Sequence, residues 1–217
     1  MRLSQIEFGS LLTYSPRGNS DTLSLSRTMM ITLKNDGFWQ SKSNHILMSD
    51  YIAEGIKNNM RNLPFADYFN VNPILVPTPN SSLNKSGTLW VPQRLAAALV
   101  RKGLGSKVVE CLNRVTPLPK SATSSATNRP KAAEHYNSME VTKILHEPKE
   151  ILLVDDVITR GATLLGAANK LADAFPNARI RAFAAIRTMS SESNFVRIND
   201  PCIGTINLNG SETFRNP

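Results

Sequence analysis

The chain has 217 residues, 41% of them hydrophobic, which is enough for one α/β domain with a sizeable core and too apolar for a disordered protein. Its formal charge of +8 indicates an anionic partner, either a phosphorylated small molecule or a nucleic acid. Its two distant cysteines argue against a zinc ribbon or a disulfide framework, and no apolar stretch reaches the ~20 residues that span a bilayer, so we expect a cytoplasmic protein with no membrane partner.

The first 70 residues combine strand-like and helix-like patterns, and we expect them to form a small cap, or hood. In TLSLSRTMMITLK, residues 22–34, apolar and polar side chains alternate in places, which favours half-buried strands. The segment 49–63 has apolar residues at four-residue spacing, which predicts a helix that Ser49 or Asp50 caps. No linker separates this part from the remainder, so it is not expected to be an independent domain.

Strand and helix patterns alternate from residue 71 to about residue 190. This order predicts an α/β fold in which a parallel, twisted, Rossmann-like sheet is flanked by helices on both faces. Residues 191–217 are then a C-terminal extension. The expected strands are NPILVPTP, KVVECL, ILLVDD and IRAFAAI. The expected helices lie in TLWVPQRLAAALVRKGLG, with Gly103 as the C-cap, and in TLLGAANKLADAF.

The stretch ILLVDDVITRGATL, residues 151–164, ends a buried strand in two adjacent aspartates, Asp155 and Asp156. Neighbouring like charges repel each other unless a ligand or a hydrogen-bond donor meets them. In parallel sheets, ligands bind beyond the carboxyl ends of the strands, and the free N–H groups of a helix N-terminus bind phosphate. The stretch thus indicates acceptors for sugar hydroxyls beside a phosphate loop. The expected phosphate-binding residues are Thr159, Arg160, Gly161, Ala162 and Thr163.

Other classes of protein also end an apolar strand in acids. A nucleotide-hydrolysing enzyme needs a G-x-x-x-x-G-K-[ST] loop, which this chain lacks. A receiver-like pocket needs an early aspartate pair and a late lysine at strand ends, and neither can be placed. An ordinary strand with exposed acids at its tip is the remaining alternative.

The complete pattern of residues 151–164 resembles the ribose-phosphate signature of type I phosphoribosyltransferases. The resemblance covers about residues 71–187, and the spacing from the VPTP strand is most similar to the ComF-type branch. It implies that Asp155 and Asp156 hold the 2′- and 3′-hydroxyls of phosphoribosyl pyrophosphate and that the segment 159–163 holds the 5′-phosphate. A loop with a strained or cis peptide would face the pyrophosphate; a plain proline-rich turn is the alternative. The residues of that loop are Pro77, Thr78 and Pro79, with Thr78–Pro79 as the candidate cis bond.

Three features depart from the family pattern. Thr159 stands where purine-salvage members carry an acid, which disfavours a purine acceptor. Arg160 replaces the commoner threonine; it either adds charge to the phosphate site or is solvated on the loop. The N-terminal zinc ribbon of ComF proteins is missing. The acceptor and the general base are therefore not predicted.

Residues 113–137 show no periodicity and are rich in Ser, Thr, Pro and Ala, which predicts a long mobile loop. In the family such a loop closes over the pyrophosphate, and magnesium is held mostly by the substrate itself. A flexible basic segment for solubility or nucleic acid is the alternative. Because the segment is irregular, we expect few of its basic side chains to be buried, and we expect His135 behind it to be structural or exposed. The expected catalytic residues are Arg114, Lys120, Arg129 and Lys131.

These features together predict a transferase that binds phosphoribosyl pyrophosphate and passes its phosphoribosyl group to a small nitrogenous acceptor, with release of pyrophosphate. The family is compatible with a homodimer. The alternative is a non-catalytic sensor of the same fold that binds a ribose-phosphate ligand and contacts nucleic acid. The sequence shows neither a helix-turn-helix nor a basic stripe interleaved with aromatic residues, and either of these features would favour that alternative.

Overall fold

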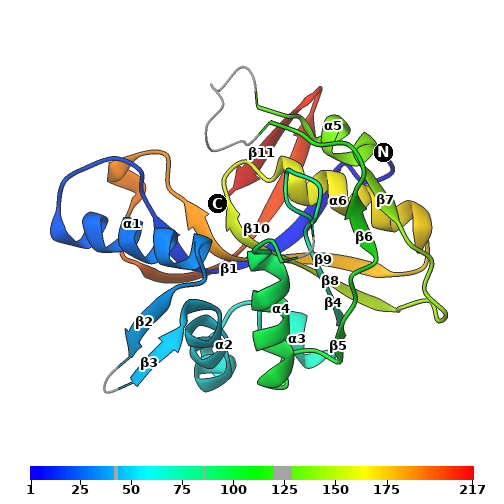
Figure 1. The fold of residues 1–217 in the computed structure, drawn as a ribbon. Coiled ribbons are helices and arrows are strands. Elements are labelled where there is room, and N and C mark those ends of the chain that lie inside the picture. Colours follow the sequence, from blue (N-terminus) through cyan, green and yellow to red (C-terminus); the bar gives the residue numbers. More distant parts are fainter. Residues whose placement is uncertain (42–43, 86, 120–128) are drawn as a thin grey trace.

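The computed structural model of the chain describes residues 1–41, 44–85, 87–119 and 129–217. Figure 1 shows one large twisted sheet with helices on both sides and two short two-stranded ribbons beside it. The strands are β1 (Gln5–Tyr14), β2 (Phe38–Ser41), β3 (Asn44–Leu47), β4 (Ile74–Pro77), β5 (Lys107–Val108), β6 (Leu112–Arg114), β7 (Met139–Val141), β8 (Glu150–Ile158), β9 (Arg179–Thr188), β10 (Asn199–Asn209) and β11 (Glu212–Asn216).

The helices are short or amphipathic and pack against the sheet. Within the described part of the chain, no helix is long and apolar enough to cross a membrane. The helices are α1 (Asp21–Lys34), α2 (Met48–Asn59), α3 (Ala66–Asn70), α4 (Val91–Arg101), α5 (Ala132–Asn137) and α6 (Ala162–Ala174), with single 3₁₀ turns η1 (Met60–Asn62) and η3 (Glu192–Asn194).

The main sheet has the strand order β11-β10-β1-β9-β8-β4-β5. Each neighbouring pair from β1 to β5 is parallel, whereas β10 runs antiparallel to both of its neighbours. The expected α/β fold, a mostly parallel sheet flanked by helices, is confirmed. β8 and β9 lie inside the sheet, so their carboxyl ends meet in the middle of one edge, where α/β sheets bind ligands.

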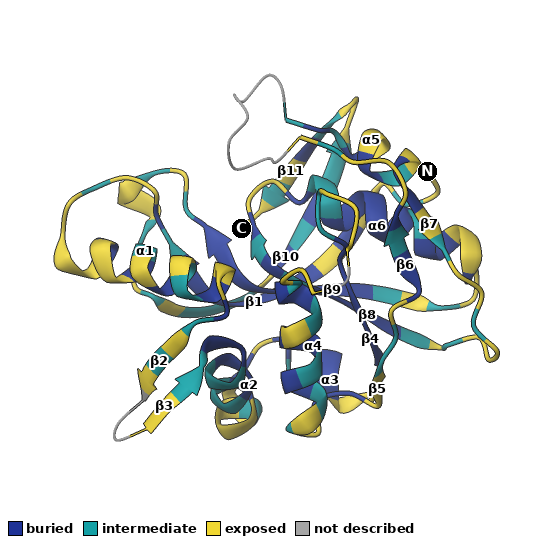
Figure 2. Ribbon diagram, viewed as in Figure 1, coloured by how far each residue is buried: buried dark blue, intermediate teal, exposed yellow. Residues whose placement is uncertain are grey.

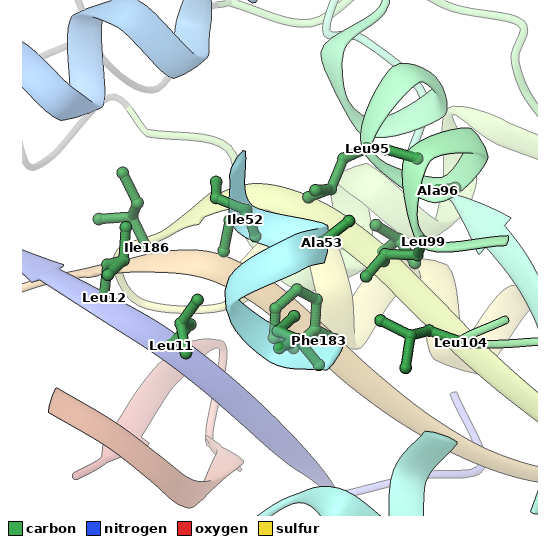
Figure 3. Close-up of a cluster of buried hydrophobic side chains, with 14 of the residues drawn as sticks. Leu11, Leu12, Ile52, Ala53, Leu95, Ala96, Leu99, Leu104, Phe183 and Ile186 are labelled. Atoms are coloured by element: carbon green, nitrogen blue, oxygen red, sulfur yellow. The ribbon is translucent and has the colours of Figure 1, made fainter. Parts of the chain in front are cut away.

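Successive residues of β8 enter two separate hydrophobic layers. Leu152 and Val154 pack with Phe183 and the residues of α2 and α4 that Figure 3 draws. Ile151 and Leu153 pack on the other face, against α6. Figure 2 shows the result, a dark, buried centre between exposed helix surfaces. Burial on both faces explains why this strand is a continuous apolar run and not an alternating one.

The strands expected within residues 22–34 are wrong, because this segment is the helix α1. The Ser20 hydroxyl accepts a hydrogen bond from the Leu23 N–H group at 3.3 Å and caps the helix. Leu23, Met29 and Leu33 are buried at helical spacing, whereas Leu25, which suggested a two-residue period, is 46% exposed. The alternation of apolar and polar residues in this segment arose because Leu25 lies on the exposed side of the helix.

Both ends of the chain contribute strands to the main sheet. β1 lies between β9 and β10, with Phe8 beside Ala182 in parallel register and beside Gly204 in antiparallel register. Residues 5–14 therefore belong to the sheet and not to a cap, whereas α1 stands outside the sheet (Figure 1). β10 and β11, from the expected C-terminal extension, complete the opposite side. Residues from all three expected parts thus share one sheet.

Residues 113–137 are not irregular throughout. Arg114 ends β6, which pairs with β7, and residues 132–137 form α5. These elements are too short to leave a periodic pattern in the sequence. The strand expected over residues 107–112 is likewise divided, since β5 ends at Val108 and β6 begins at Leu112.

Two further local expectations are corrected. The Thr78–Pro79 peptide is trans, because Asn216–Pro217 is the only cis peptide among the described residues. The Thr78 N–H group donates to the Val154 carbonyl at 2.9 Å, which continues the pairing of β4 with β8. α2 begins one residue before the expected cap, with Leu47 in the capping position.

Candidate functional site

A cavity of about 540 Å³ lies at the carboxyl ends of β8 and β9. Its wall combines the end of β1, part of α1, the β8–α6 loop, residues 129–131 and the start of β11. In Figure 1, α1 and the N-terminus of α6 stand on opposite sides of the β8 end. The expected site residues that line this cavity are Arg129, Lys131, Asp155, Thr159, Arg160, Gly161, Ala162 and Thr163.

The β8–α6 loop turns sharply at Gly161 into the N-terminus of α6. Gly161 has a φ of +85°, in the left-handed region that favours glycine, and α6 begins at the next residue. A Cβ atom at Gly161 would lie 2.7 Å from the side chain of Ile206, so this position has no room for a larger residue. The first N–H groups of α6 lack partners within the helix and carry the positive end of its dipole, next to the cavity.

Arg215 of β11 fastens this loop to the end of β9. Its Nε donates to the Thr159 carbonyl at 3.0 Å and its Nη2 donates to the Thr188 carbonyl at 2.6 Å. The hydroxyls of Thr159 and Thr188 lie 3.1 Å apart. Burial lowers the pKa of the Arg215 guanidinium to about 10, and the neighbouring charge of Arg187 acts in the same direction. The loop is therefore held rigidly from three strands.

The structure separates the two aspartates of the expected diol site. Both lie within β8, not beyond its end, and only Asp155 lines the cavity. Burial raises the pKa of the Asp155 carboxyl to about 7, and repulsion from Asp156 adds to this rise, while Lys34 and the Thr78 hydroxyl oppose it. The neutral form of Asp155 is therefore favoured, and in that form the carboxyl can both donate and accept hydrogen bonds.

Asp156 is buried and paired with Lys34 of α1, whose Nζ lies 2.7 Å from Oδ2 of the carboxylate. Burial by itself lowers the pKa of Lys34, but the charge of Asp156, the hydrogen bond to it and the charge of Asp155 raise it overall. Lys34 also lines the cavity. The mutual repulsion of the two aspartates is therefore met by a cation from α1 within the chain itself.

Three basic side chains stand around the β8–α6 loop. Lys131 Nζ lies 3.1 Å from the carboxylate of Glu212 and 2.8 Å from the Ser211 hydroxyl, and Arg160 Nη1 lies 3.8 Å from the same carboxylate. The Nε atom of Arg129 is buried and makes no hydrogen bond within the described residues. A buried guanidinium donor without a partner costs free energy, so a hydrogen-bond acceptor at this position would be favourable.

The other expected residues that the structure describes do not line the cavity. Pro77, Thr78 and Pro79 are buried beneath it, and the Thr78 carbonyl accepts from Trp90 Nε1 at 2.7 Å. Arg114 is also buried, with 6% of its surface exposed, contrary to the expectation of a solvated loop side chain. Lys120 lies outside the described residues.

Arg114 is fixed from several directions. Its Nε donates to the Asn80 carbonyl at 3.0 Å, its Nη1 donates to the Ser138 hydroxyl, and its Nη2 lies 3.4 Å from Nδ1 of His135. Burial lowers the pKa of Arg114 to about 10, an effect that the charge of Asp155 opposes. Arg114 therefore joins the loop after β4 to α5 and does not itself line the cavity.

Sequence reasoning missed several residues of the cavity wall. Lys34 and Met30 belong to α1; the capping pair Ser20 and Asp21 is the local signal that would have revealed this helix. Glu212, by contrast, approaches the β8–α6 loop through the pairing of β11 with β10, and no local pattern predicts that approach.

Comparisons with known proteins assign no family to this chain. No protein-family profile and no curated protein matches the sequence. Among solved structures, the crystal structure of TT1426 from Thermus thermophilus is similar at 15% sequence identity, over 68% of this chain and 83% of that chain, with a TM-score of 0.31. A similarity at this level supports no statement about function, so the function has to be inferred from the geometry of the site.

Proposed function

We propose that the protein is a phosphoribosyltransferase of the type I kind, similar to the ComF branch, which binds phosphoribosyl pyrophosphate in the cavity at the end of β8. The observation that carries the proposal is the juxtaposition of a half-buried carboxyl, Asp155, with a glycine-centred helix N-terminus at Gly161. The carboxyl suits sugar hydroxyls and the helix N-terminus suits a phosphate monoester. A phosphorylated ribose carries both of these groups.

The charge around the cavity supports an anion with more than one phosphoryl group. Arg129, Lys131 and Arg160 surround the phosphate loop, and the unpartnered Nε of Arg129 provides a buried donor. Among the described lining residues on that side, Glu212 is the only acid, and it already pairs with Lys131. In the proposed reaction, a nitrogen of the acceptor forms the bond to the anomeric carbon, and the bond from that carbon to pyrophosphate breaks. The basic residues stabilise the charge that develops on the leaving group.

Magnesium fits this site as a companion of the substrate. No group of three or more His, Cys, Asp or Glu side chains within the described residues is arranged to hold a metal ion. Magnesium prefers oxygen ligands and keeps phosphate and water in its coordination shell, so pyrophosphate oxygens would hold it, and it would neutralise their charge. The chain supplies the cations and the carboxyl of Asp155 around that complex.

A non-catalytic sensor with the same ligand is the second candidate. The observation that favours it is the internal pairing of Asp156 with Lys34, which withdraws one of the two acids that the resemblance assigns to the ribose diol. A sensor needs to bind ribose phosphate without activating it. The net charge of +8 would then contribute to contacts with nucleic acid.

The first experiment measures binding of phosphoribosyl pyrophosphate by calorimetry in the presence of magnesium. We expect Asp155→Asn to weaken binding by about 10-fold or more, because hydrogen bonds to a charged or half-charged group contribute ~1.5–3 kcal/mol. Asp50→Asn is the matched control. Asp50 lies on α2, its Oδ1 is 2.7 Å from Nη2 of Arg101, and it does not line the cavity. Equal affinity of the wild type and Asp155→Asn would contradict the proposed site.

The second experiment separates the enzyme from the sensor. The wild type is screened for pyrophosphate release with a panel of nitrogenous acceptors, and for retention of DNA and RNA at several salt concentrations. The enzyme predicts release with at least one acceptor. Binding of phosphoribosyl pyrophosphate without release by any acceptor, together with a steep salt dependence of nucleic-acid retention, would select the sensor.

A further inference from the structure

A chain of three side chains connects the interior of the protein to the phosphate loop. Arg114 Nη2 lies 3.4 Å from Nδ1 of His135, and His135 Nε2 lies 3.3 Å from Oγ1 of Thr163. Thr163 is in the first turn of α6 and lines the cavity, whereas Arg114 and His135 are buried. His135 thus bridges a fixed cation and a hydroxyl of the proposed site.

The chemistry of arginine determines which atom donates and which atom accepts in these contacts. A guanidinium has only donors, so Nδ1 of His135 has to accept, and the single ring proton of a neutral imidazole is then on Nε2. Burial, with the charge of Arg114 added, lowers the pKa of His135 to about 4, so the ring is neutral at pH 7. The Nε2–H group therefore donates to Thr163 Oγ1, and the hydroxyl hydrogen of Thr163 has to point elsewhere.

The surrounding packing keeps this direction fixed. Arg114 also donates through Nε to the Asn80 carbonyl and through Nη1 to the Ser138 hydroxyl, so turning the guanidinium away from His135 would break both of these contacts. α5, which carries His135, packs on α6 at Gly166, where an added Cβ would lie 2.6 Å from the Ala132 carbonyl. Within the described residues, Thr163 Oγ1 has no hydrogen-bond partner other than His135.

We propose that His135 is a positioning residue that commits the Thr163 hydroxyl to donate its hydrogen into the cavity, so that this position accepts a phosphoryl oxygen and disfavours ligand groups that donate. The inference rests on the proposed function, because it assigns the phosphate end of the same ligand. A fully ionised phosphate monoester has only acceptors, and the oriented hydroxyl adds one donor to those of the helix N-terminus.

The first test reads the tautomer directly. Two-bond ¹⁵N–¹H correlation spectra of the wild type distinguish Nδ1–H, Nε2–H and doubly protonated rings, and loss of one set of signals in His135→Gln assigns this residue among the three histidines. We expect the neutral Nε2–H form at pH 7. A ring protonated on Nδ1 would overturn the proposal, whatever the protein binds.

The second test uses two substitutions that divide the contacts of His135. In His135→Gln, the amide nitrogen reaches the former Nε2 position and still donates to Thr163. In His135→Asn, the amide oxygen takes the former Nδ1 position and still accepts from Arg114, but the donor to Thr163 is lost. With ribose 5-phosphate as the probe in calorimetry, we expect His135→Asn to bind about 10-fold more weakly than His135→Gln.

Thr163→Val completes a double-mutant cycle, since it removes the hydroxyl and keeps the shape. When Thr163→Val is combined with each His135 substitution, the two double variants should bind ribose 5-phosphate equally. Equal binding by the two His135 variants while Thr163 is present, or a difference between them that persists after Thr163→Val, would contradict the proposal. If the wild type binds neither ribose 5-phosphate nor phosphoribosyl pyrophosphate, the proposed function fails instead, and the tautomer measurement still tests the positioning of His135.

Discussion

Asp155, which is half-buried, and His135, which is buried, are ionisable residues near the cavity whose neutral forms desolvation favours. Asp155 keeps its proton up to about pH 7, against an ordinary value of 3.8, and His135 remains neutral down to about pH 4, against an ordinary value of 6.5. The sequence predicted that Asp155 is a site residue, because two adjacent acids after an apolar run are unusual. It did not predict a direction for either pKa, since the largest cause of both shifts is burial, which depends on the tertiary packing.

These two residues should affect the pH dependence of stability in opposite directions. Asp155 binds a proton in the native state that the unfolded state releases, so its contribution is present below pH 3.8 and is lost as pH rises to about 7. His135 lacks a proton that the unfolded state binds, so its contribution is present above pH 6.5 and is lost as pH falls to about 4. In the wild type the two effects partly cancel.

Single substitutions should reveal each effect. In Asp155→Asn, we expect the free energy of unfolding to rise more steeply with pH between pH 3.8 and about pH 7 than in the wild type. The difference in slope should be up to ~1.4 kcal/mol per pH unit. In His135→Asn, the free energy of unfolding should fall with pH relative to the wild type over the same range. Urea unfolding across this range measures both slopes, and parallel profiles for the wild type and Asp155→Asn would show that the pKa of Asp155 is not raised.

Arg114 and Lys131 were expected to be equivalent loop residues, and the structure makes them different. Arg114→Ala should cost about 3 kcal/mol of unfolding free energy, because it removes a buried charge and leaves its partners unsatisfied. Lys131→Ala should cost within ~0.5 kcal/mol, since its side chain is 41% exposed and its ion pair with Glu212 is screened by solvent. Chemical denaturation of the two variants compares them directly, and similar costs would contradict the burial of Arg114.

At the scale of elements, the sequence was sufficient to identify a helix or a strand where one local pattern ran through it without interruption. The apolar run of β8, the proline in the first turn of α4 and the glycine before α6 identified these elements from sequence. α1 was misread because its exposed residues imitate a two-residue period. α5 was missed because a six-residue helix is held by its contacts with α6 and not by its own sequence.

The packing of α5 on α6 can be tested at Gly166. Gly166→Ala would place a Cβ 2.6 Å from the Ala132 carbonyl and 2.9 Å from the Tyr136 amide nitrogen, so α5 has to shift. We expect a loss of stability of about 1–3 kcal/mol, as for other overpacked sites, and faster hydrogen exchange in α5.

Gly55→Ala is the matched control in α2. The nearest atom to its added Cβ is a Leu11 methyl group at 3.8 Å, an ordinary contact. This substitution should raise stability by about 0.5–1 kcal/mol through helix propensity alone. If both substitutions stabilise the protein, the close approach of α5 to α6 is wrong.

At the scale of the whole molecule, the ends of the chain are part of one sheet. β10 pairs with β1 from Gln5 to Leu12, and β11 pairs with β10 and carries Arg215 to the β8–α6 loop. The last residues are therefore not a detachable extension. The same holds for residues 5–14, which separate β9 from β10.

A chain that ends at residue 190 tests this arrangement. Without β10, the edge of β1 loses its hydrogen-bond partners and Phe8, now fully buried, loses its contact with Gly204. We expect the shortened chain to lack a cooperative thermal transition and to aggregate through the exposed strand edge. A shortened chain that melts cooperatively near the wild-type temperature would show that residues 191–217 are an independent appendage after all.

The sequence by itself determined the features that neighbouring residues specify: an α/β fold, a buried strand ending near Asp155, and a loop at Gly161 that leads into a helix. Each depends on residues within a few positions of one another, so local periodicity and backbone preference reveal it. Only the tertiary structure decided which distant groups meet at the site. Lys34 reaches Asp156 across 122 positions, and Arg215 reaches Thr159 across 56. Such contacts follow from strand order and helix packing, which one sequence does not encode in any local pattern.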